Sequence, residues 1–439
     1  MRWGGISILD WRSIHLTKNE NALITKGARR MRKTKGIWKR ATGVMAMAAL
    51  LMTAGCAQSS TSSGSGSDDK GGGSRGSVKI GFILSQTGTF APLSEGIVNG
   101  FQLYLEQHNG MLGGKKVEMK VEDDEANPQV ALRKYRQLVH GEKVDILVGP
   151  ISSAVAYALR DEVEKDKKVL IDANAAGDDL SWSKKSDYVY RVSFSNWQNG
   201  SSTAKYLAEQ VGKKAVILAP DYPAGKEVLR AFKATFEAAG GKVLKEIYPK
   251  LNTNDFAPYL QEASAEKPDF IYAFFTGSDG IRFITQYKEF GLKGKIPLTG
   301  PLEFGDELLT QPTGEAAEGI IAGINYSPYL DNEQNKQFVE AYKEKYGKLP
   351  NIFAVQGYDS AAAIDQAINK AGSLNSHDLI KILKGISLDS PRGKITIDPA
   401  THNPIQNFYI SKNVLKDGAI VPQILETVEN VKMPEASPF

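Results

Sequence analysis

From Val78 onward, short runs of β-favouring residues alternate with amphipathic segments, and this alternation is the strongest constraint on the fold. Strands that are joined by helices lie parallel in one sheet, with helices on its faces. The runs form two series that are separated by a break near residues 194–200. The first series is Val78–Leu84, Val117–Val121, Val144–Val148, Val169–Asp172 and Tyr188–Phe194, and the second is Ala215–Ala219, Val243–Tyr248, Phe270–Phe275, Ile296–Thr299 and Ile320–Ile324. The sequence therefore predicts two similar α/β lobes rather than one long sheet.

Helix signals lie between the predicted strands. Ile97, Phe101 and Leu105 recur every four residues and define one face of a helix. Asn127 and Pro128 provide an N-cap and a proline at the first helical position. Near the end, a helix over residues 353–369 is followed by late strands at 394–398, 408–411 and 420–427. We expect these late elements to return the chain to the first lobe and then to the second.

Cys56 is the only cysteine in the 439 residues. It follows a basic segment and the apolar stretch Ala41–Ala54, which is shorter than the roughly 20 residues of a membrane-spanning helix. This layout is typical of a signal peptide. The small residues before Cys56 resemble the lipobox of bacterial lipoproteins, although Thr53 stands where an aliphatic residue is usual. The resemblance implies that Cys56 is lipidated; a plain secretory leader is the alternative.

The expected organisation follows from these segments. Residues 1–55 form a signal peptide with an extra N-terminal extension, because Met31 begins a second leader-like sequence. Residues 56–77 form a disordered Ser/Gly linker that tethers the anchor to the folded body. The first lobe is expected at residues 78–196 and the second at 197–324. Residues 325–402 return to the first lobe, and residues 403–439 return to the second and end in a tail.

The positive charge belongs to the leader. The chain carries net charge +4, but residues 1–55 hold 11 of its 54 Lys and Arg and only 2 of its 50 Asp and Glu. The remaining residues therefore carry net charge −5, with no basic stripe for nucleic acid. We predict no nucleic-acid partner.

Signals for catalysis are weak. The five histidines are scattered without metal-ligand spacing, and no phosphate loop, dinucleotide turn or nucleophile elbow is present. Beyond Cys56 the chain has no thiol for a disulfide or a nucleophile. We predict no catalytic residues, no metal and no cofactor.

A turn at residues 149–154 is the best candidate for binding. Gly149-Pro150 follows a predicted strand, and Ser152 and Ser153 precede a helix-like stretch at residues 155–165. Exposed N–H groups at a helix start favour an anion, so a carboxylate could bind there together with the Ser153 hydroxyl. Simple N-capping by the serines is the alternative, and the two roles can coexist.

Beyond these local signals, the sequence resembles the extracytoplasmic solute-binding proteins of ABC importers, in the branch that includes the leucine/isoleucine/valine-binding protein. The order and spacing of short motifs over more than 300 residues carry the resemblance. These motifs are Lys79-Ile80-Gly81 with Gly88 and Asn99-Gly100, Asn109-Gly110 with Gly113-Gly114, Glu122-Asp123-Asp124 with Asn127-Pro128, Val148-Gly149-Pro150 with Ser152-Ser153, Asp221-Tyr222 with Gly225, Gly300-Pro301, and Gly357-Tyr358-Asp359. The resemblance implies the type I periplasmic-binding-protein fold, in which three hinge crossovers join two doubly wound lobes. We expect the crossovers near residues 194–200, 325–329 and 402–406.

The resemblance also implies a ligand site between the lobes. In amino-acid-binding members the ligand carboxylate meets a serine after the Gly-Pro-like turn, here Ser153 with Ser152 beside it. The next strand-end loop and aromatic residues of the second lobe complete the pocket, at positions that fall near Ala224 and Thr276. The remaining candidates for these roles and for an apolar wall are Asn174, Ala175, Ala176, Phe90, Tyr222, Phe275 and Thr276.

Two positions depart from the family pattern. Ala176 lacks a hydroxyl, and Leu302 stands where an acidic residue usually pairs with the ligand ammonium. Glu303 can take that role if the loop shifts by one residue; otherwise the ligand is a carboxylate without an α-amino group, with an aromatic or branched body. A buried ammonium without a partner would cost several kcal/mol.

The resemblance thus implies a monomeric, lipid-anchored extracytoplasmic protein that delivers a branched-chain amino acid or a related carboxylate, for which an aromatic body is one option, to an ABC permease. A ligand-sensing receptor domain of the same fold, which feeds a signalling partner, is the alternative.

Overall fold

The structure, a computed structural model, describes residues 76–439. The predicted signal peptide, Cys56 and all but the last two residues of the linker lie outside the described residues. Within the described part of the chain, no helix combines the length and the apolar character that a membrane crossing requires.

The first lobe is built on a six-stranded sheet with strand order β2-β3-β1-β4-β5-β6. All neighbouring strands are parallel except β2, which pairs antiparallel with β3. The strands are β1 (Ser77–Leu84), β2 (Met111–Leu112), β3 (Lys115–Asp123), β4 (Ile146–Val148), β5 (Val169–Asp172) and β6 (Val189–Arg191). Their connections contain α1 (Ala91–Gln107), α2 (Pro128–Arg136), which continues as a π-helical turn at Gln137–Gly141, and α3 (Ser153–Asp166).

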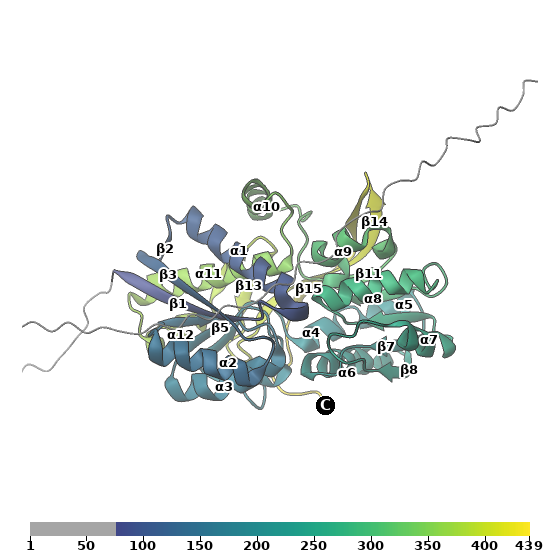
Figure 1. Ribbon diagram of the computed structural model, residues 1–439, viewed down its shortest axis with the longest axis horizontal. Coiled ribbons are helices and arrows are strands. Elements are labelled where there is room, and N and C mark those ends of the chain that lie inside the picture. Colours follow the sequence, from purple (N-terminus) through teal and green to yellow (C-terminus); the bar gives the residue numbers. More distant parts are fainter. Residues whose placement is uncertain (1–75) are drawn as a thin grey trace, which may run out of the picture. The chain divides into compact units, whose positions relative to one another are not determined.

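Strand β1 shows why this sheet forms. Its side chains are buried on both faces, as expected for a central parallel strand. Ile80 and Phe82 pack in one core with α1 and with α11 (Ile352–Ala371), whereas Ile83 packs in another core with α2 and α3. Figure 1 shows these two helical layers on opposite sides of the sheet. Helix α2 begins as predicted, because the Asn127 side chain accepts the Gln129 N–H at 2.8 Å.

The second lobe is built around a larger sheet with the order β12-β13-β14-β11-β10-β9-β7-β8, and β15 pairs with the other side of β14. The strands of this sheet are β7 (Lys214–Leu218), β8 (Lys242–Ile247), β9 (Phe270–Ala273), β10 (Leu298–Pro301), β11 (Ile321–Ile324), β12 (Ser387–Ser390), β13 (Gly393–Ile397), β14 (Pro404–Lys416) and β15 (Ala419–Val431). Its β12 and β13 belong to the first lobe, whose core contains Leu388, Ile395 and Ile397. Along β7, Ala215 and Ile217 face one core, and Val216 and Leu218 face the other. The helices of this lobe are α5 (Ala204–Gln210), α6 (Pro223–Ala238), α7 (Ala257–Ala265), α8 (Gly277–Glu289) and α9 (Glu307–Thr313).

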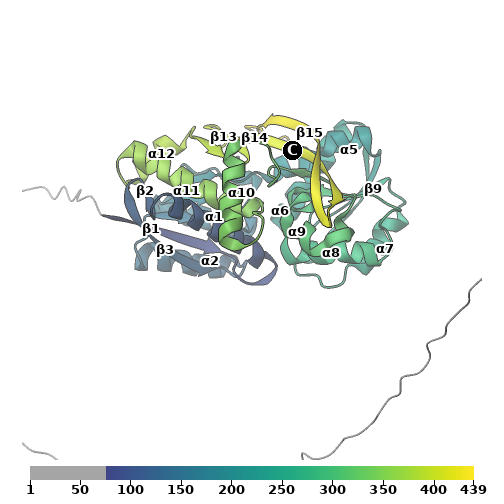
Figure 2. The same ribbon diagram turned by 90° about the horizontal axis from the view of Figure 1, so that it is seen from above.

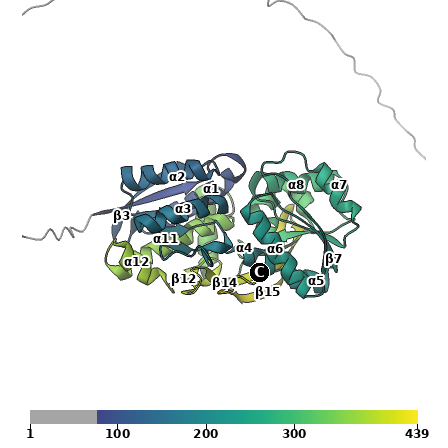
Figure 3. The ribbon, with the colours of Figure 1, turned by 90° about the horizontal axis from the view of Figure 1, so that it is seen from below.

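The chain passes between the lobes three times. After β6 it enters α4 (Asn196–Ser201), which packs on α6 of the second lobe (Figure 3). After β11 it returns to the first lobe through α10 (Glu333–Tyr346), α11 and α12 (Ser376–Leu383). Finally, β14 pairs with β13 at its start and with β11 further along. Figure 2 shows β14 and β15, in yellow, reaching from the first lobe to the second. The predicted fold class, two doubly wound lobes joined by three crossovers, is confirmed.

The main difference from the predicted elements lies in β14 and β15. Each has 13 residues, whereas the sequence pattern indicated only residues 408–411 and 420–427. Strand β15 is largely exposed, including residues 423–427, and several buried positions of β14 are polar (Gln406, Ser411 and Asn413). Neither strand therefore shows the buried apolar alternation that signals a strand.

A buried polar network ties the three crossovers together. The Arg392 guanidinium forms an ion pair with Asp359 of α11 at 2.9 Å and donates to the Ser193 carbonyl at 3.0 Å. The Gln406 side chain accepts from Arg392 at 2.7 Å and from the Asn325 amide at 2.9 Å. Ser193, Asn325 and Gln406 belong to the first, second and third crossovers, so one guanidinium and one amide hold all three at a single point.

Candidate ligand-binding site

A cavity lies where the carboxyl ends of strands from both lobes meet, which is where open α/β sheets bind ligands. Water-sized spheres can occupy only about 20 Å³ of it, which is room for about one water molecule. Every residue that lines it follows the end of a strand. These residues are Phe90 and Leu93 after β1, Ile151 and Ser153 after β4, Asn174 and Ala176 after β5, Phe194 and Asn196 after β6, Tyr222 and Ala224 after β7, Phe274 and Thr276 after β9, and Glu303 after β10.

The turn at Gly149 positions the first polar wall. Gly149 has φ +111°, and a Cβ atom there would lie 2.1 Å from the Ile83 carbonyl oxygen of β1. Only glycine allows this approach, which lets the chain turn directly into α3. Ser153 is the first residue of α3 and its side chain lines the cavity.

The start of α3 is suited to an anion. Ser152 is the N-cap residue, but its side chain makes no capping hydrogen bond, and the first N–H groups of a helix have no partner within it. The Asn196 amide nitrogen lies 3.4 Å from the Ser153 hydroxyl. A hydroxyl, an amide and helix N-terminal N–H groups can together hold a carboxylate by hydrogen bonds. None of the described residues that line this cavity is Lys, Arg or His.

The opposite polar wall is Glu303, in the second lobe. The Thr276 hydroxyl donates to its Oε1 at 2.8 Å, whereas its Oε2 has no hydrogen-bond partner among residues 76–439. The side chain is 3% exposed. Burial raises the pKa of Glu303 to about 7, and the bond from Thr276 partly counteracts the rise. An uncharged carboxyl can both donate and accept a hydrogen bond, and an ionised one only accepts.

The side walls are apolar and aromatic. Phe90 of the first lobe and Tyr222 of the second approach each other across the cavity, with ring centroids 6.3 Å apart. Phe194 and Phe274 add two further rings, and Ile151 is one of the aliphatic side chains. The surface between the two polar walls is therefore apolar and rich in aromatic rings.

Of the eleven ligand-site residues that the sequence suggested, seven line this cavity: Phe90, Ser153, Asn174, Ala176, Tyr222, Thr276 and Glu303. The structure places the other four elsewhere. Ser152 ends the turn as the N-cap of α3, and Ala175 packs against Ala156 and Leu180. Phe275 stacks on Phe283, with centroids 4.5 Å apart, inside the second lobe. Leu302 packs with Ala176, Phe194 and Phe408.

The loop after β10 corrects the expectation for Leu302. Pro301 ends the strand and a 3₁₀ turn follows at Leu302–Gly305, so Leu302 lies in the apolar cluster and Glu303 lines the cavity. The acidic group is therefore present in the cavity, one residue after the position that the family pattern indicates.

Sequence reasoning missed Leu93, Ile151, Phe194, Asn196 and Phe274 as lining residues. Each lies within a few residues of a strand end, which is the signal that could have indicated it. Asn196 also follows Ser195, which caps α4 through a complete capping box with Gln198.

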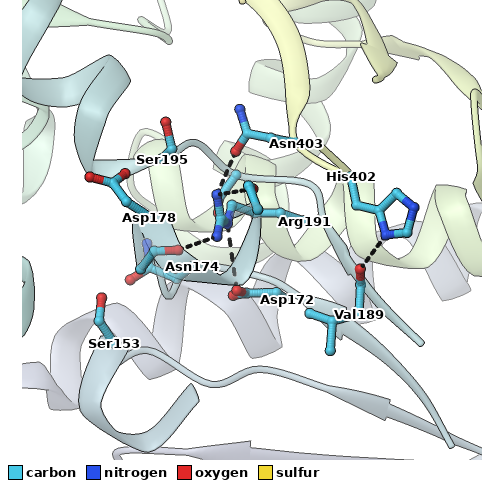
Figure 4. A network of polar contacts seen from close by, with 12 residues as sticks. Ser153, Asp172, Asn174, Asp178, Val189, Arg191, Ser195, His402 and Asn403 are labelled. Atoms are coloured by element: carbon cyan, nitrogen blue, oxygen red, sulfur yellow. Dashed lines mark hydrogen bonds and ion pairs between the residues drawn. The ribbon is translucent and has the colours of Figure 1, made fainter. Parts of the chain in front are cut away.

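A second polar network lies beside the cavity and fixes the loop after β5 (Figure 4). Arg191 donates to the Gly177 carbonyl and to the Asn403 side chain, both at 2.7 Å. Its guanidinium also lies 3.6 Å from the Asp172 carboxyl. Burial raises the pKa of Asp172 to about 7, and the nearby Arg191 charge partly counteracts this rise. His402 stacks on Tyr190, and its Nδ1 lies 3.1 Å from the Ser186 carbonyl. These groups hold the cavity wall in place and do not line it.

Nothing in the described part of the chain suggests a metal centre, because no group of three or more His, Cys, Asp or Glu side chains there could hold an ion.

Comparison with known proteins identifies sequence and structural relatives of this fold. Residues 77–419 match the sequence family described as periplasmic binding protein. A solute-binding protein of an ABC transporter from Rhodopseudomonas palustris BisB5, solved with 3,4-dihydroxybenzoic acid, is 33% identical with a TM-score of 0.79, over 82% of this chain and 99% of that one.

Two further relatives are informative. A solute-binding protein of an ABC transporter from R. palustris, solved with benzoate, is 34% identical with a TM-score of 0.75, over 80% of this chain and 98% of that one. The Leu/Ile/Val-binding protein homolog 6 of Brucella melitensis is 29% identical, over 80% of this chain and 92% of its own length.

Proposed function

Because this chain belongs to the periplasmic binding protein family, a class of extracytoplasmic solute-binding proteins and not of enzymes, we propose that it captures a small carboxylate between its lobes for an ABC importer. The closed, ligand-bound form would dock on the membrane permease and deliver the ligand. We further propose that it acts as a monomer, without catalytic activity, and that a lipid on Cys56 holds it at the cell membrane.

The observation that carries this proposal is the polarity of the cavity. Ser153 and the start of α3 offer hydrogen-bond donors on the first lobe, whereas Glu303 offers a carboxyl on the second. A carboxylate is favoured at the donor side, because the helix N-terminus carries partial positive charge. It is disfavoured beside Glu303, where two acidic groups would be buried together.

The Glu303 Oε2, which has no hydrogen-bond partner within residues 76–439, suggests what the other end of the ligand carries. A buried carboxyl oxygen without a partner is costly, so a ligand that donates a hydrogen bond there gains affinity. A phenolic hydroxyl suits an uncharged or an ionised Glu303, whereas an ammonium needs the ionised form. With a pKa of about 7, Glu303 is about half ionised at neutral pH, so a phenolic hydroxyl suits both of its forms and an ammonium suits one.

We therefore rank a hydroxylated aromatic acid first and a branched-chain amino acid second. The ring-lined walls support this order, as do the aromatic acids bound to two relatives of 33% and 34% identity. The name of the Brucella relative keeps leucine, isoleucine and valine in consideration.

Thermal-shift and calorimetric titration of the purified protein test this ranking. The panel is benzoate, 4-hydroxybenzoate, 3,4-dihydroxybenzoate, leucine and 4-methylpentanoate. A ligand at 100 times its Kd should stabilise the fold by about 2.7 kcal/mol. We expect a hydroxybenzoate to bind about 5- to 150-fold more tightly than benzoate, which corresponds to about 1–3 kcal/mol for pairing a buried polar group. Binding of leucine alone would overturn the ranking, and binding of no small carboxylate would overturn the proposal.

Two substitutions locate the effect. Glu303→Leu should reduce the preference for the hydroxylated acid, because leucine cannot form the hydrogen bond. Glu307→Leu is the matched control, because Glu307 is also buried in the next helix but does not line this cavity.

Mass spectrometry of the mature protein should find a diacylglyceryl group on Cys56. Loss of uptake of the labelled ligand on gene deletion would support import over the alternative role in sensing.

A further inference from the structure

Glu227, on α6 of the second lobe, receives three hydrogen bonds from outside its own lobe. Its Oε1 accepts from the Tyr157 hydroxyl of α3 at 2.6 Å. Its Oε2 accepts from the backbone N–H of Asp178 at 2.9 Å and from the Asn196 amide at 2.7 Å. Tyr157 and Asp178 belong to the first lobe, and Asn196 begins α4 in the first crossover. One carboxylate thus gathers donors from three separate segments.

The same donors connect Glu227 to the cavity. The Asn196 amide nitrogen, which donates to Glu227, also lies 3.4 Å from the Ser153 hydroxyl. Tyr157 lies four residues after Ser153 in α3, and residues at this spacing share one face of a helix. The helix that presents Ser153 to the cavity therefore also carries the tyrosine that contacts Glu227, although Glu227 itself does not line the cavity.

The surroundings of Glu227 reinforce these contacts. The Tyr157 hydroxyl accepts the Asp179 N–H at 3.2 Å while it donates to Glu227, so the bonds form a chain in which each strengthens the next. The Asp178 carboxyl accepts the Trp197 N–H at 2.8 Å, which fixes the same loop to the start of α4. Burial and the neighbouring Glu227 raise the pKa of the Asp178 carboxyl well above its usual range.

We propose that Glu227 is a positioning residue that couples ligand binding to lobe closure, by bonding the first lobe and by holding the Asn196 amide toward Ser153. This role rests on the proposed function. When the lobes separate, Glu227 leaves Tyr157 and Asp178, so these bonds stabilise the closed state alone. Ligand drives closure only through contacts that are stronger in the closed state, and removal of this carboxylate lowers the fraction of protein that can close.

Glu227→Gln tests the proposal, because an amide has the same shape but presents an NH₂ group to at least one of the donors. We expect the dissociation rate of the tightest-binding acid of the panel to rise at least tenfold. We also expect a larger radius of gyration than in the parent protein when both are measured with ligand by small-angle X-ray scattering. The control is Glu246→Gln, since Glu246 bonds Lys233 and Tyr248 within the second lobe, away from the cavity. Its dissociation rate should stay within twofold of the parent value.

A second variant keeps the test decisive if Glu227→Gln does not fold. Tyr157→Phe removes one hydrogen-bond donor but keeps the ring. The ring packs closely on Gly177, since a Cβ atom there would lie 2.7 Å from it, so phenylalanine preserves this packing. We expect a dissociation rate at least threefold above that of the parent. If the parent protein binds the acid and both variants keep its dissociation rate and its radius of gyration, the proposed role of Glu227 is wrong. If the parent protein itself does not bind the acid, the proposed function is contradicted.

Discussion

Gly277 should control how closely the two lobes approach. It begins α8 with φ +56°, and a Cβ atom there would lie 2.0 Å from the Thr89 carbonyl oxygen of the first lobe. Real Cβ contacts essentially never fall below 3.0 Å, so Gly277→Ala must separate these segments by about 1 Å. That shift would break two bonds of the Thr89 hydroxyl, which donates to the Thr276 carbonyl at 3.3 Å and accepts from the Asp279 N–H at 3.1 Å.

The expected loss follows from these two bonds. Each contributes about 0.5–1.5 kcal/mol, so closure should lose about 1–3 kcal/mol and the Kd should rise about 5- to 150-fold. Strain of alanine at positive φ affects the open and closed forms equally, and lowers the unfolding free energy without changing the Kd.

Isothermal titration of the parent and two variants separates these effects. Gly294→Ala is the control, because Gly294 has φ +80° and nothing lies within 4 Å of its added Cβ. Both variants should lose thermal stability, but only Gly277→Ala should bind more weakly. A parental Kd for Gly277→Ala would refute the reasoning that these segments meet on closure.

Two further predictions concern stability. Burial lowers the pKa of His402 from 6.5 to about 4, so between these values the unfolded chain takes up a proton that the folded protein does not. The parent protein should therefore lose about 3 kcal/mol of unfolding free energy between pH 7 and pH 4. This loss should be absent from His402→Asn, because asparagine tolerates the same φ of +53° but does not titrate. Urea unfolding at the two pH values measures it, and an equal pH dependence of parent and variant would contradict the prediction. Asp359→Ala leaves the buried Arg392 unpaired and should lower the unfolding free energy by about 3–5 kcal/mol. The control Asp331→Ala breaks the exposed pair with Lys336 and should leave the urea midpoint unchanged. Equal effects of the two substitutions would refute the claim that the buried pair stabilises the fold.

The fold was predictable because parallel strands are buried on both faces. Runs such as residues 78–84 and 169–172 therefore stand out as continuous apolar segments between amphipathic helices. The hairpin of β14, with polar residues at buried positions, and the largely exposed β15 gives no such contrast, and its length was underestimated. Its register depends on pairing with β11, which only the assembled sheet provides.

The site was predictable to the level of strand ends but not always of single residues. Adjacent residues point to opposite sides where a strand ends, so Phe274 lines the cavity and Phe275 packs in the core against Phe256 and Phe283. Which of these two rings faces the cavity depends on where β9 ends, and the packing of Phe275 against Phe256 and Phe283 fixes that point. The same holds for Leu302 and Glu303, where a 3₁₀ turn decides which side chain enters the cavity.

Residues that act across the lobes gave no local signal. Asn196 reaches the cavity because the crossover after β6 places α4 against α6. In the sequence, Glu227 is one charged residue among several on an amphipathic helix, and its three donors lie 31 to 70 residues away. Such contacts follow from how the lobes meet and could not be read from spacing along the chain.

The central claim is that Ser153, at the start of α3, holds the ligand carboxylate. Its most direct test compares Ser153→Ala with Ser152→Ala by isothermal titration of the tightest-binding acid. Ser152 is the matched neighbour, since it is buried beside Ser153 but does not line the cavity. A lost hydrogen bond to a charged group costs about 1.5–3 kcal/mol, so Ser153→Ala should raise the Kd about 10- to 150-fold while Ser152→Ala binds like the parent. Parental binding by Ser153→Ala would contradict the account.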